Sequence, residues 1–245
     1  MMKTIDINCD LGEGMGNEAQ LMPLISSCNI ACGGHAGDLQ SMKEAVILAK
    51  SNHVKIGAHP SFPDKLNFGR TKMDMNSTDL FDALKHQIEL LKSLVERAQL
   101  QLHHVKPHGA LYNIASVDER TAKIVVGVVK TIDENLIVYA PFKSVISEIA
   151  KTEGIKIMHE VFADRNYNDD LTLVSRNLKN ALIHDPNIMF DHVYNMIHFG
   201  KVNTINKVEV ELKADTFCVH GDGKNVVENL KQLIAKLKHH HIEIS

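Results

Sequence analysis

The chain has 245 residues, with 27 Lys and Arg against 30 Asp and Glu, and 44% of its residues are hydrophobic. This composition is typical of a soluble globular protein, and the length suits a single (β/α) barrel of roughly 250 residues. The formal net charge is -3 and the charges form no basic block. We therefore exclude nucleic acid and anionic membranes as main partners.

Two further absences bear on location. No apolar run reaches the roughly 18 residues of a membrane helix, and residues 1–14 become polar and acidic too early for a secretory signal. We therefore expect a cytoplasmic protein. Its four cysteines are too few for a disulfide scaffold and match no paired C-x-x-C zinc site. We expect reduced thiols, with Cys9 and Cys32 buried as small apolar residues rather than acting as nucleophiles.

Short β-like runs alternate with longer amphipathic stretches along almost the whole chain. The predicted strands cover residues 4–8, 29–32, 54–58, 103–106, 136–140, 156–162 and 216–220. Apolar residues at helical spacing lie between them, for example over 42–49 and 80–98. Residues 76–78 predict a helix start near Asp79, and Ser116 with Glu119 has the spacing of a capping box.

Alternation of strand and helix implies parallel strands joined by right-handed crossovers. Seven such units can close as a barrel or lie open as a wound sheet. We favour an α/β fold with a distorted or incomplete TIM-like barrel of about seven parallel strands. Residues 201–213 interrupt the rhythm, and their alternation on either side of Asn206 predicts a small inserted hairpin.

Potentially reactive side chains fall at the C-terminal ends of the predicted strands. In a parallel barrel these ends share one face, so residues far apart in sequence can meet in one pocket. The candidates are Asn8, Asp10, Glu13, His35, His59, Lys106, His108, Asp164, Arg165, His220 and Asp222. Neighbouring glycines and prolines supply tight, stiff turns at these positions.

Four of the 15 histidines stand in such Gly- or Pro-bracketed loops, namely His35, His59, His108 and His220. With the nearby carboxylates they could form a centre for zinc or another first-row divalent ion, or carry out metal-free acid–base chemistry. No H-E-x-x-H or similar short ligand pair decides between the two. The run 239–241 is better explained as a solvated helix end.

Lys106, at a strand end before a proline, could hold an anionic substrate group or act with a lowered pKa. Arg165 could make a bidentate contact with a carboxylate or phosphate, or form an ion pair with a neighbouring acid. Arg70 and Arg176 are weaker candidates for anion binding. The sequence contains no P-loop motif, no G-x-S-x-G elbow and no correctly spaced dinucleotide fingerprint.

Six motifs together resemble the LamB/YcsF family over nearly the whole chain and in the same order. They are DINCDLGEGMG (6–16), NIACGGHAGD (29–38), GAHPSFPD (57–64) with FGR (68–70), VKPHGALYN (105–113), FADRNY (162–167) with LVSR (173–176), and CVHGD (218–222). The chain departs from the family pattern at Gly34, Leu39, Phe62 and Leu171. These departures bear on loop shape and substrate affinity.

The resemblance implies a single barrel domain over residues 1–245, related to the glycoside hydrolase and deacetylase type. It also implies ATP-dependent opening of the 5-oxoproline lactam to glutamate, by the A component of a 5-oxoprolinase that works with partner subunits B and C. ATP would be the co-substrate, and the resemblance leaves open where ATP binds and whether a divalent metal takes part.

We assign roles as hypotheses on this basis. Asp10 with His59 or His108 would do the acid–base work, and Lys106 and Arg165 would hold anionic groups. Supporting, substrate-binding or ligand positions go to Asn8, Glu13, His35, Asp164, His220 and Asp222. Two other functions compete: a stand-alone metal-dependent amidohydrolase or deacetylase, and a ligand-binding subunit without catalytic activity.

Overall fold

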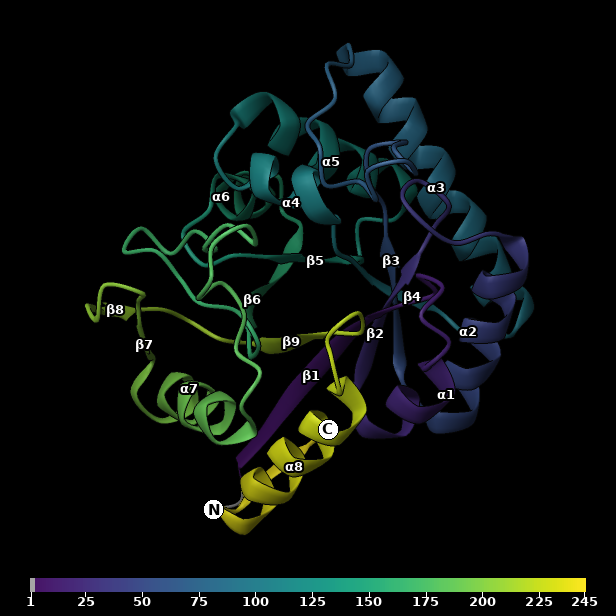
Figure 1. Ribbon diagram of the computed structural model, residues 1–245. Helices are drawn as coiled ribbons and strands as arrows, with labels where there is room; N and C mark the ends of the chain where they lie inside the picture. The colour runs from purple at the N-terminus through teal and green to yellow at the C-terminus, as the bar shows by residue number, and fades with distance from the viewer. Residues whose placement is uncertain (1–2) are drawn as a thin grey trace.

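The computed structural model describes residues 3–245, and these build a barrel of seven parallel strands (Figure 1). The barrel strands are β1 (Lys3–Leu11), β2 (Ser27–Ala31), β3 (Lys55–His59), β4 (Leu102–Val105), β5 (Ile137–Ala140), β6 (Lys156–Phe162) and β9 (Thr216–His220). Strand β9 pairs with both β6 and β1, which closes the ring. The predicted barrel of about seven parallel strands is confirmed, and its sheet is closed.

Two irregularities distort the barrel. Strand β1 pairs with two different strands along its length. Its residues Lys3 to Ile5 pair with β10 (Ile242–Ile244), whereas Asp6 to Asp10 pair with β9. The register between β3 and β4 also shifts next to Gly57. A Cβ on Gly57 would lie 2.1 Å from Nε2 of His104, so only glycine leaves room for that ring inside the barrel.

Helices surround the barrel on its outside (Figure 1). They are α1 (Glu18–Leu21), the 3₁₀ helix η1 (Met22–Leu24), α2 (Leu39–Asn52), α3 (Ser77–Arg97), α4 (Gly109–Ala115), α5 (Glu119–Ile132), α6 (Val145–Thr152), α7 (Pro186–Phe199) and α8 (Val226–His239). Apolar residues at helical spacing pack inward, as Leu84, Ile88 and Leu91 do on α3. No helix formed by residues 3–245 is both long enough and apolar enough to span a bilayer.

Side-chain caps fix where the helices begin. The Asn76 side chain accepts a hydrogen bond from the Asp79 backbone at 2.9 Å, as the predicted helix start requires. The predicted capping box at Ser116 is wrong. Helix α5 begins at Glu119, so Asp118 holds the capping position and accepts from the Thr121 backbone at 2.8 Å. Ser116 instead caps the C-terminal end of α4.

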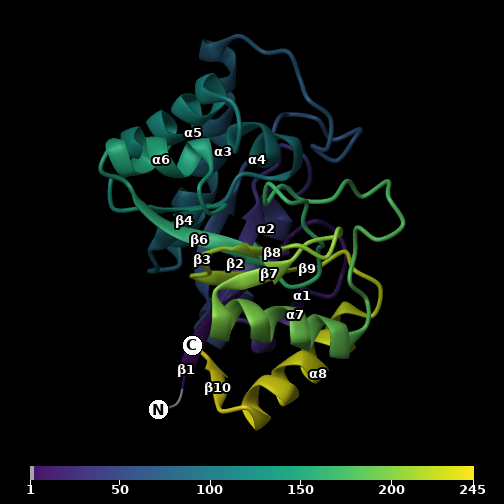
Figure 2. The same ribbon diagram turned by 90° about the vertical axis from the view of Figure 1, so that its left-hand side faces the viewer.

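The predicted hairpin is present as the antiparallel pair β7 (Lys201–Asn203) and β8 (Glu209–Glu211). Figure 2 shows the long loops after β3 and β6 projecting from the same side of the molecule. The carboxyl ends of the barrel strands lie on this side, and the loops form a wall around them. The fold therefore leaves one enclosed face in which distant polar residues can meet.

Candidate active site

The carboxyl ends of the strands open onto a cavity of about 980 Å³. Eight of the eleven candidate residues line it: Asp10, Glu13, His59, Lys106, His108, Arg165, His220 and Asp222. The other three, Asn8, His35 and Asp164, are buried behind this lining. The fold thus brings the candidates together, while their chemical roles stay predictions.

Lys106 occupies the centre of the site with only 3% of its surface exposed. Its Nζ lies 2.9 Å from Oδ1 of Asp10 and 2.9 Å from Oε1 of Glu160. Burial alone would lower the pKa of Lys106, but the adjacent carboxylates outweigh it and hold that pKa well above its ordinary value. Lys106 is therefore a fixed positive charge, not a neutral amine that could act as a base.

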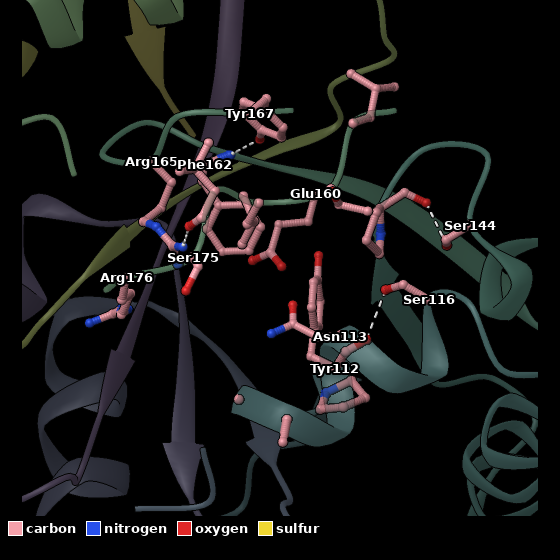
Figure 3. Close-up of a pocket in the computed structure, with 18 of the residues that line it drawn as sticks. Tyr112, Asn113, Ser116, Ser144, Glu160, Phe162, Arg165, Tyr167, Ser175 and Arg176 are labelled. Atoms are coloured by element: carbon pink, nitrogen blue, oxygen red, sulfur yellow. Dashed lines mark hydrogen bonds between the residues drawn. The ribbon is translucent and has the colours of Figure 1, made fainter. Parts of the chain in front are cut away.

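Sequence reasoning did not select Glu160 as a site residue, because it lies inside a strand of otherwise largely apolar character. A buried carboxylate in such a strand needs a cationic partner, and this requirement was the signal available in the sequence. Tyr112 was also missed. Figure 3 shows its hydroxyl and the Glu160 carboxylate directed toward one another. Burial first, and Glu160 next, raise the pKa of this hydroxyl.

Asp10 is held from below by a column of polar side chains inside the barrel. Asn29 donates through Nδ2 to Oδ1 of Asp10 and to Oδ1 of Asn8, both at 2.8 Å. Asn8 in turn donates to Thr216 at 2.8 Å. Asn8 is fully buried one layer beneath the cavity, so it can position Asp10 but does not line the cavity itself. Burial alone would raise the pKa of Asp10, but the charges of His59 and Lys106 hold it well below its usual range.

Three histidines and one glutamate form a compact group, which we call the histidine cluster: Glu13, His35, His59 and His108. His108 Nδ1 lies 2.9 Å from His59 Nε2 and 3.5 Å from Oε1 of Glu13. His35 donates through Nε2 to the same Glu13 oxygen at 3.0 Å, and its ring stacks on that of His108. Burial is the main cause that lowers the pKa of both His35 and His108, so both rings stay neutral near pH 7.

The loop after β3 closes over this cluster with strained backbone. Phe68 has a φ of 54°, which is uncommon for a bulky residue, and its carbonyl accepts from His108 Nε2 at 3.0 Å. Gly69 follows with a φ of 62°, and a Cβ there would lie 2.9 Å from Cβ of His35. Backbone strain of this kind costs about 1–3 kcal/mol and persists only where surrounding contacts enforce it.

A second His–carboxylate pair lies at the end of β9, the neighbour of β1 in the barrel. Asp164 accepts through Oδ1 from His220 Nδ1 at 2.9 Å and through Oδ2 from the His220 backbone at 2.9 Å. The tautomer with a proton on Nδ1 leaves a lone pair on Nε2 of His220. Burial alone would raise the pKa of Asp164, but His220 offsets it and the pKa is lowered.

Figure 3 shows Arg165 and Arg176 on the same side of the cavity. Arg165 is buried and donates through Nη2 to the carbonyl of Val174 at 2.6 Å. Among residues 3–245 its Nε atom has no hydrogen-bond partner. Arg70 and Arg176 both pair with Asp222, at 2.6 and 3.1 Å. Asp222 therefore pairs with two arginines at the mouth and offsets one of their two charges, while Arg165 keeps an unsatisfied donor.

The cysteines do not provide a nucleophile. Cys9, Cys28, Cys32 and Cys218 are free and buried. Burial raises the pKa of Cys32 to about 12, and it also raises that of Cys9. The thiols accordingly stay protonated and behave as small apolar groups.

Comparison with known proteins identifies relatives over the full length of the chain. The family model described as LamB/YcsF matches residues 5–245. The A subunit of 5-oxoprolinase from Campylobacter jejuni is 44% identical, covering 99% of this chain and 97% of the relative. The protein of the same name from Haemophilus influenzae is 41% identical, and the match covers 100% of both chains.

Solved structures agree with this relationship. The lactam utilization protein from Thermus thermophilus superposes with a TM-score of 0.92 at 34% identity, and 98% of each chain is covered. A putative cellobiose-phosphate cleavage protein from Enterococcus faecalis shares the fold alone, with a TM-score of 0.61 at 10% identity. The full-length family match and the similarity of the chain to these relatives show that it belongs to the LamB/YcsF family.

Proposed function

We propose that this chain is the A component of a 5-oxoprolinase and opens the lactam of 5-oxoproline to give L-glutamate, with consumption of ATP and together with partner subunits B and C. The observation that carries the proposal is the full-length similarity, at 41–44% identity, to proteins that bear the name of this 5-oxoprolinase component. The chemistry of the cavity supports it, because the reaction needs cationic groups for an anionic substrate and a group that accepts a proton.

ATP would make the lactam reactive. A five-membered lactam is a resonance-stabilised amide, and its hydrolysis is easily reversed. Transfer of the γ-phosphoryl group to the lactam oxygen breaks the bond to ADP and makes the ring carbon more electrophilic toward water. Water then adds to that carbon, the C–N bond breaks and the nitrogen takes up a proton. Hydrolysis of the resulting acyl phosphate gives glutamate and inorganic phosphate.

Three residues meet the demands of this reaction. We assign the substrate carboxylate to Arg165, whose buried Nε has no partner among residues 3–245. Lys106, a permanent cation at the cavity wall, would neutralise charge that develops on the lactam or phosphoryl oxygen. His220 would accept the proton of the attacking water, since Asp164 fixes the tautomer that leaves its Nε2 free.

Asp10 has a different place in this scheme. A general base works best when its pKa is near the working pH, whereas the pKa of Asp10 is held well below its usual range. We propose that Asp10 orients Lys106 and keeps it charged. The sequence-based assignment of acid–base chemistry to Asp10 stays a prediction, which a Glu substitution and a pH–rate profile would test.

The size of the cavity supports more than one occupant. Its volume of about 980 Å³ is at the upper end of the roughly 300–1,000 Å³ that small-molecule sites span, and a single five-membered ring fills a small part of it. We propose that the remaining space admits the phosphoryl donor, or a segment of a partner protein that carries it. The absence of a P-loop motif in the sequence is consistent with shared nucleotide binding.

The deciding experiment measures glutamate and ADP released from 5-oxoproline and ATP, first with this chain alone and then with subunits B and C. The proposal expects coupled release in the complex and its loss in Lys106→Met and His220→Asn variants that still assemble. Lys123→Met, at an exposed position on α5, is the matched control. ATP-independent hydrolysis by the chain alone would favour an amidohydrolase. Unchanged turnover in both cavity variants would favour a subunit that binds a ligand without catalysis.

A further inference from the structure

The histidine cluster has the chemistry of a cation site. Glu13, His35, His59 and His108 come from the loops or ends of four successive barrel strands, and all four are buried. One donor atom from each lies within 4.8 Å of the donor atoms of the others. Three imidazoles and one carboxylate are a donor set that suits zinc and other first-row divalent ions.

Hydrogen bonds to backbone carbonyls fix how two of these rings face one another. His59 donates through Nδ1 to the carbonyl of Lys106 at 2.7 Å, and His108 donates through Nε2 to the carbonyl of Phe68 at 3.0 Å. A carbonyl oxygen only accepts, so these outer nitrogens carry the hydrogens. The inner nitrogens, His59 Nε2 and His108 Nδ1, face each other at 2.9 Å and carry no hydrogen unless one of the rings takes up a second proton.

Two facing lone pairs repel each other. The contact becomes favourable when the two nitrogens share either a proton or a metal ion. Outer nitrogens that donate to backbone carbonyls are also the usual arrangement around metal-bound histidines, because it fixes the tautomer and the ring orientation. The geometry of His59 and His108 is thus that of oriented ligands.

Buried carboxylates close to the cluster also favour a cation. Asp10, Glu13 and Glu160 lie in contact with Lys106 or with the histidines. A divalent cation bound by Glu13 would also lie close to Asp10, whose Oδ2 is 3.4 Å from His59 Nε2, and the opposite charge of that carboxylate would favour its binding.

The distances also fit. Ligand bonds of about 2.0–2.1 Å in a tetrahedral site place neighbouring donor atoms about 3.3 Å apart. The contacts of Glu13 Oε1 to His35 Nε2, His108 Nδ1 and His59 Nε2 are 3.0, 3.5 and 4.0 Å. The His35 ring is parallel to that of His108, with centroids 3.6 Å apart. To act as the fourth ligand through Nε2, His35 would tilt out of this stack and carry its hydrogen on Nδ1 instead.

We propose that Glu13, His59 and His108, with His35 as the fourth donor, form a binding site for one first-row divalent cation at the wall of the cavity. The site concerns ion binding alone and does not depend on the substrate proposed above. A bound ion would lie beside the Lys106–Asp10 pair, where it adds positive charge close to the space that a substrate would fill.

The test is metal binding by the purified full-length chain after treatment with a chelator. Residues 239–241 are three exposed histidines that can bind metal adventitiously, so all variants carry Gln at these three positions. In this background we expect one Co²⁺ per chain, seen as visible absorption that Zn²⁺ displaces. Substitutions around a metal site typically weaken binding about 10- to 100-fold, so losing a ligand in His59→Ala should exceed that range.

Two further variants make the result decisive. Glu13→Gln preserves size and tests the ligand set should His59→Ala fail to fold, and it should also weaken binding more than tenfold. His86→Gln, at an exposed position on α3, should keep the ion within twofold. The proposal is overturned if no ion binds stoichiometrically once residues 239–241 are replaced, or if binding survives Glu13→Gln and His59→Ala unchanged. Neither readout uses 5-oxoproline, ATP or a partner, so it is independent of the proposed activity.

Discussion

Replacing Lys106 by Met tests whether the centre of the site depends on charge pairing. Lys106 is 3% exposed and lies 2.9 Å from one oxygen each of Asp10 and Glu160. Methionine preserves most of the aliphatic stem but leaves two buried carboxylates without their cation. Removing one partner of a buried ion pair typically costs about 3–5 kcal/mol. We expect a loss of this size in the free energy of unfolding at pH 7.

The loss of unfolding free energy should depend on pH, because the carboxylates left without a cation can become neutral by binding protons. Protonating a carboxyl group of ordinary pKa near 4 costs about 1.4 kcal/mol per pH unit, hence about 4 kcal/mol at pH 7 and about 1.4 kcal/mol at pH 5. The folded variant would have raised carboxyl pKa values, so its stability falls as pH rises through them. The difference from wild type should therefore shrink by at least about 1–2 kcal/mol between pH 7 and pH 5.

Urea unfolding of wild type and variant at both pH values measures this difference. Lys123→Met serves as the control, since Lys123 and its partner Glu119 are exposed and such pairs contribute about 0.5 kcal/mol or less. The double variant Lys106→Met with Glu160→Gln should recover part of the loss. Equal destabilisation at pH 5 and pH 7 would refute the reasoning, because it would trace the loss to packing instead of charge.

Three other predictions concern the rest of the cavity. Asp164→Asn should lower turnover of the assembled enzyme about 100-fold or more by removing the acceptor that fixes the His220 tautomer, with little change in substrate KM in steady-state assays. Burial alone would raise the pKa of Asp222. The nearby cations, Arg176 first among them, outweigh burial and lower that pKa. Its stabilising contribution is thus present above the unfolded pKa of about 3.9 and disappears as pH falls through the folded value. Acid unfolding of Asp222→Asn should lack this component, which is about 1 kcal/mol at most. Gly69→Ala should destabilise the chain by about 1–2 kcal/mol for its positive φ, plus a steric cost from His35. Gly154→Ala, with a φ of 78° and nothing within 4 Å of the added Cβ, should show the first cost alone in the same denaturant assay.

The barrel could be predicted from the sequence because each strand and helix carries its own local pattern. Short apolar runs, helical spacing and turn residues recur in every unit, and they locate all seven barrel strands to within a few residues. The Ser116 cap was misassigned for a local reason as well. Both Ser116 and Asp118 are good capping residues, and only the end of α4 decides which of them is free to cap α5.

The prediction that residues at the C-terminal ends of strands form the site located most of its residues. It did not distinguish residues that line the cavity from those buried beneath it. Side chains in a strand alternate between its two faces, so Asn8 and Asp10 point the same way, with Asn8 one layer further inside. The prediction placed both at the cavity, whereas only Asp10 lines it. Glu160 was not predicted as a site residue, because it lies two residues before the end of β6. The carbonyl of Phe68, which orients His108, depends on the path of a loop that carries no periodic signal.

Asp10 connects the two chemical halves of the site through its separate oxygens. Oδ1 lies 2.9 Å from the Lys106 ammonium and accepts from Asn29, while Oδ2 lies 3.4 Å from His59 Nε2 in the histidine cluster. Any positive charge placed on the cluster therefore competes with Lys106 for the same carboxylate. A bound cation would weaken the attraction of Asp10 for the lysine, so that Glu160 alone offsets the ammonium and more of its charge acts on an anionic ligand in the cavity. Cation binding at the histidine cluster would in this way strengthen the positive charge that Lys106 presents to an anionic ligand.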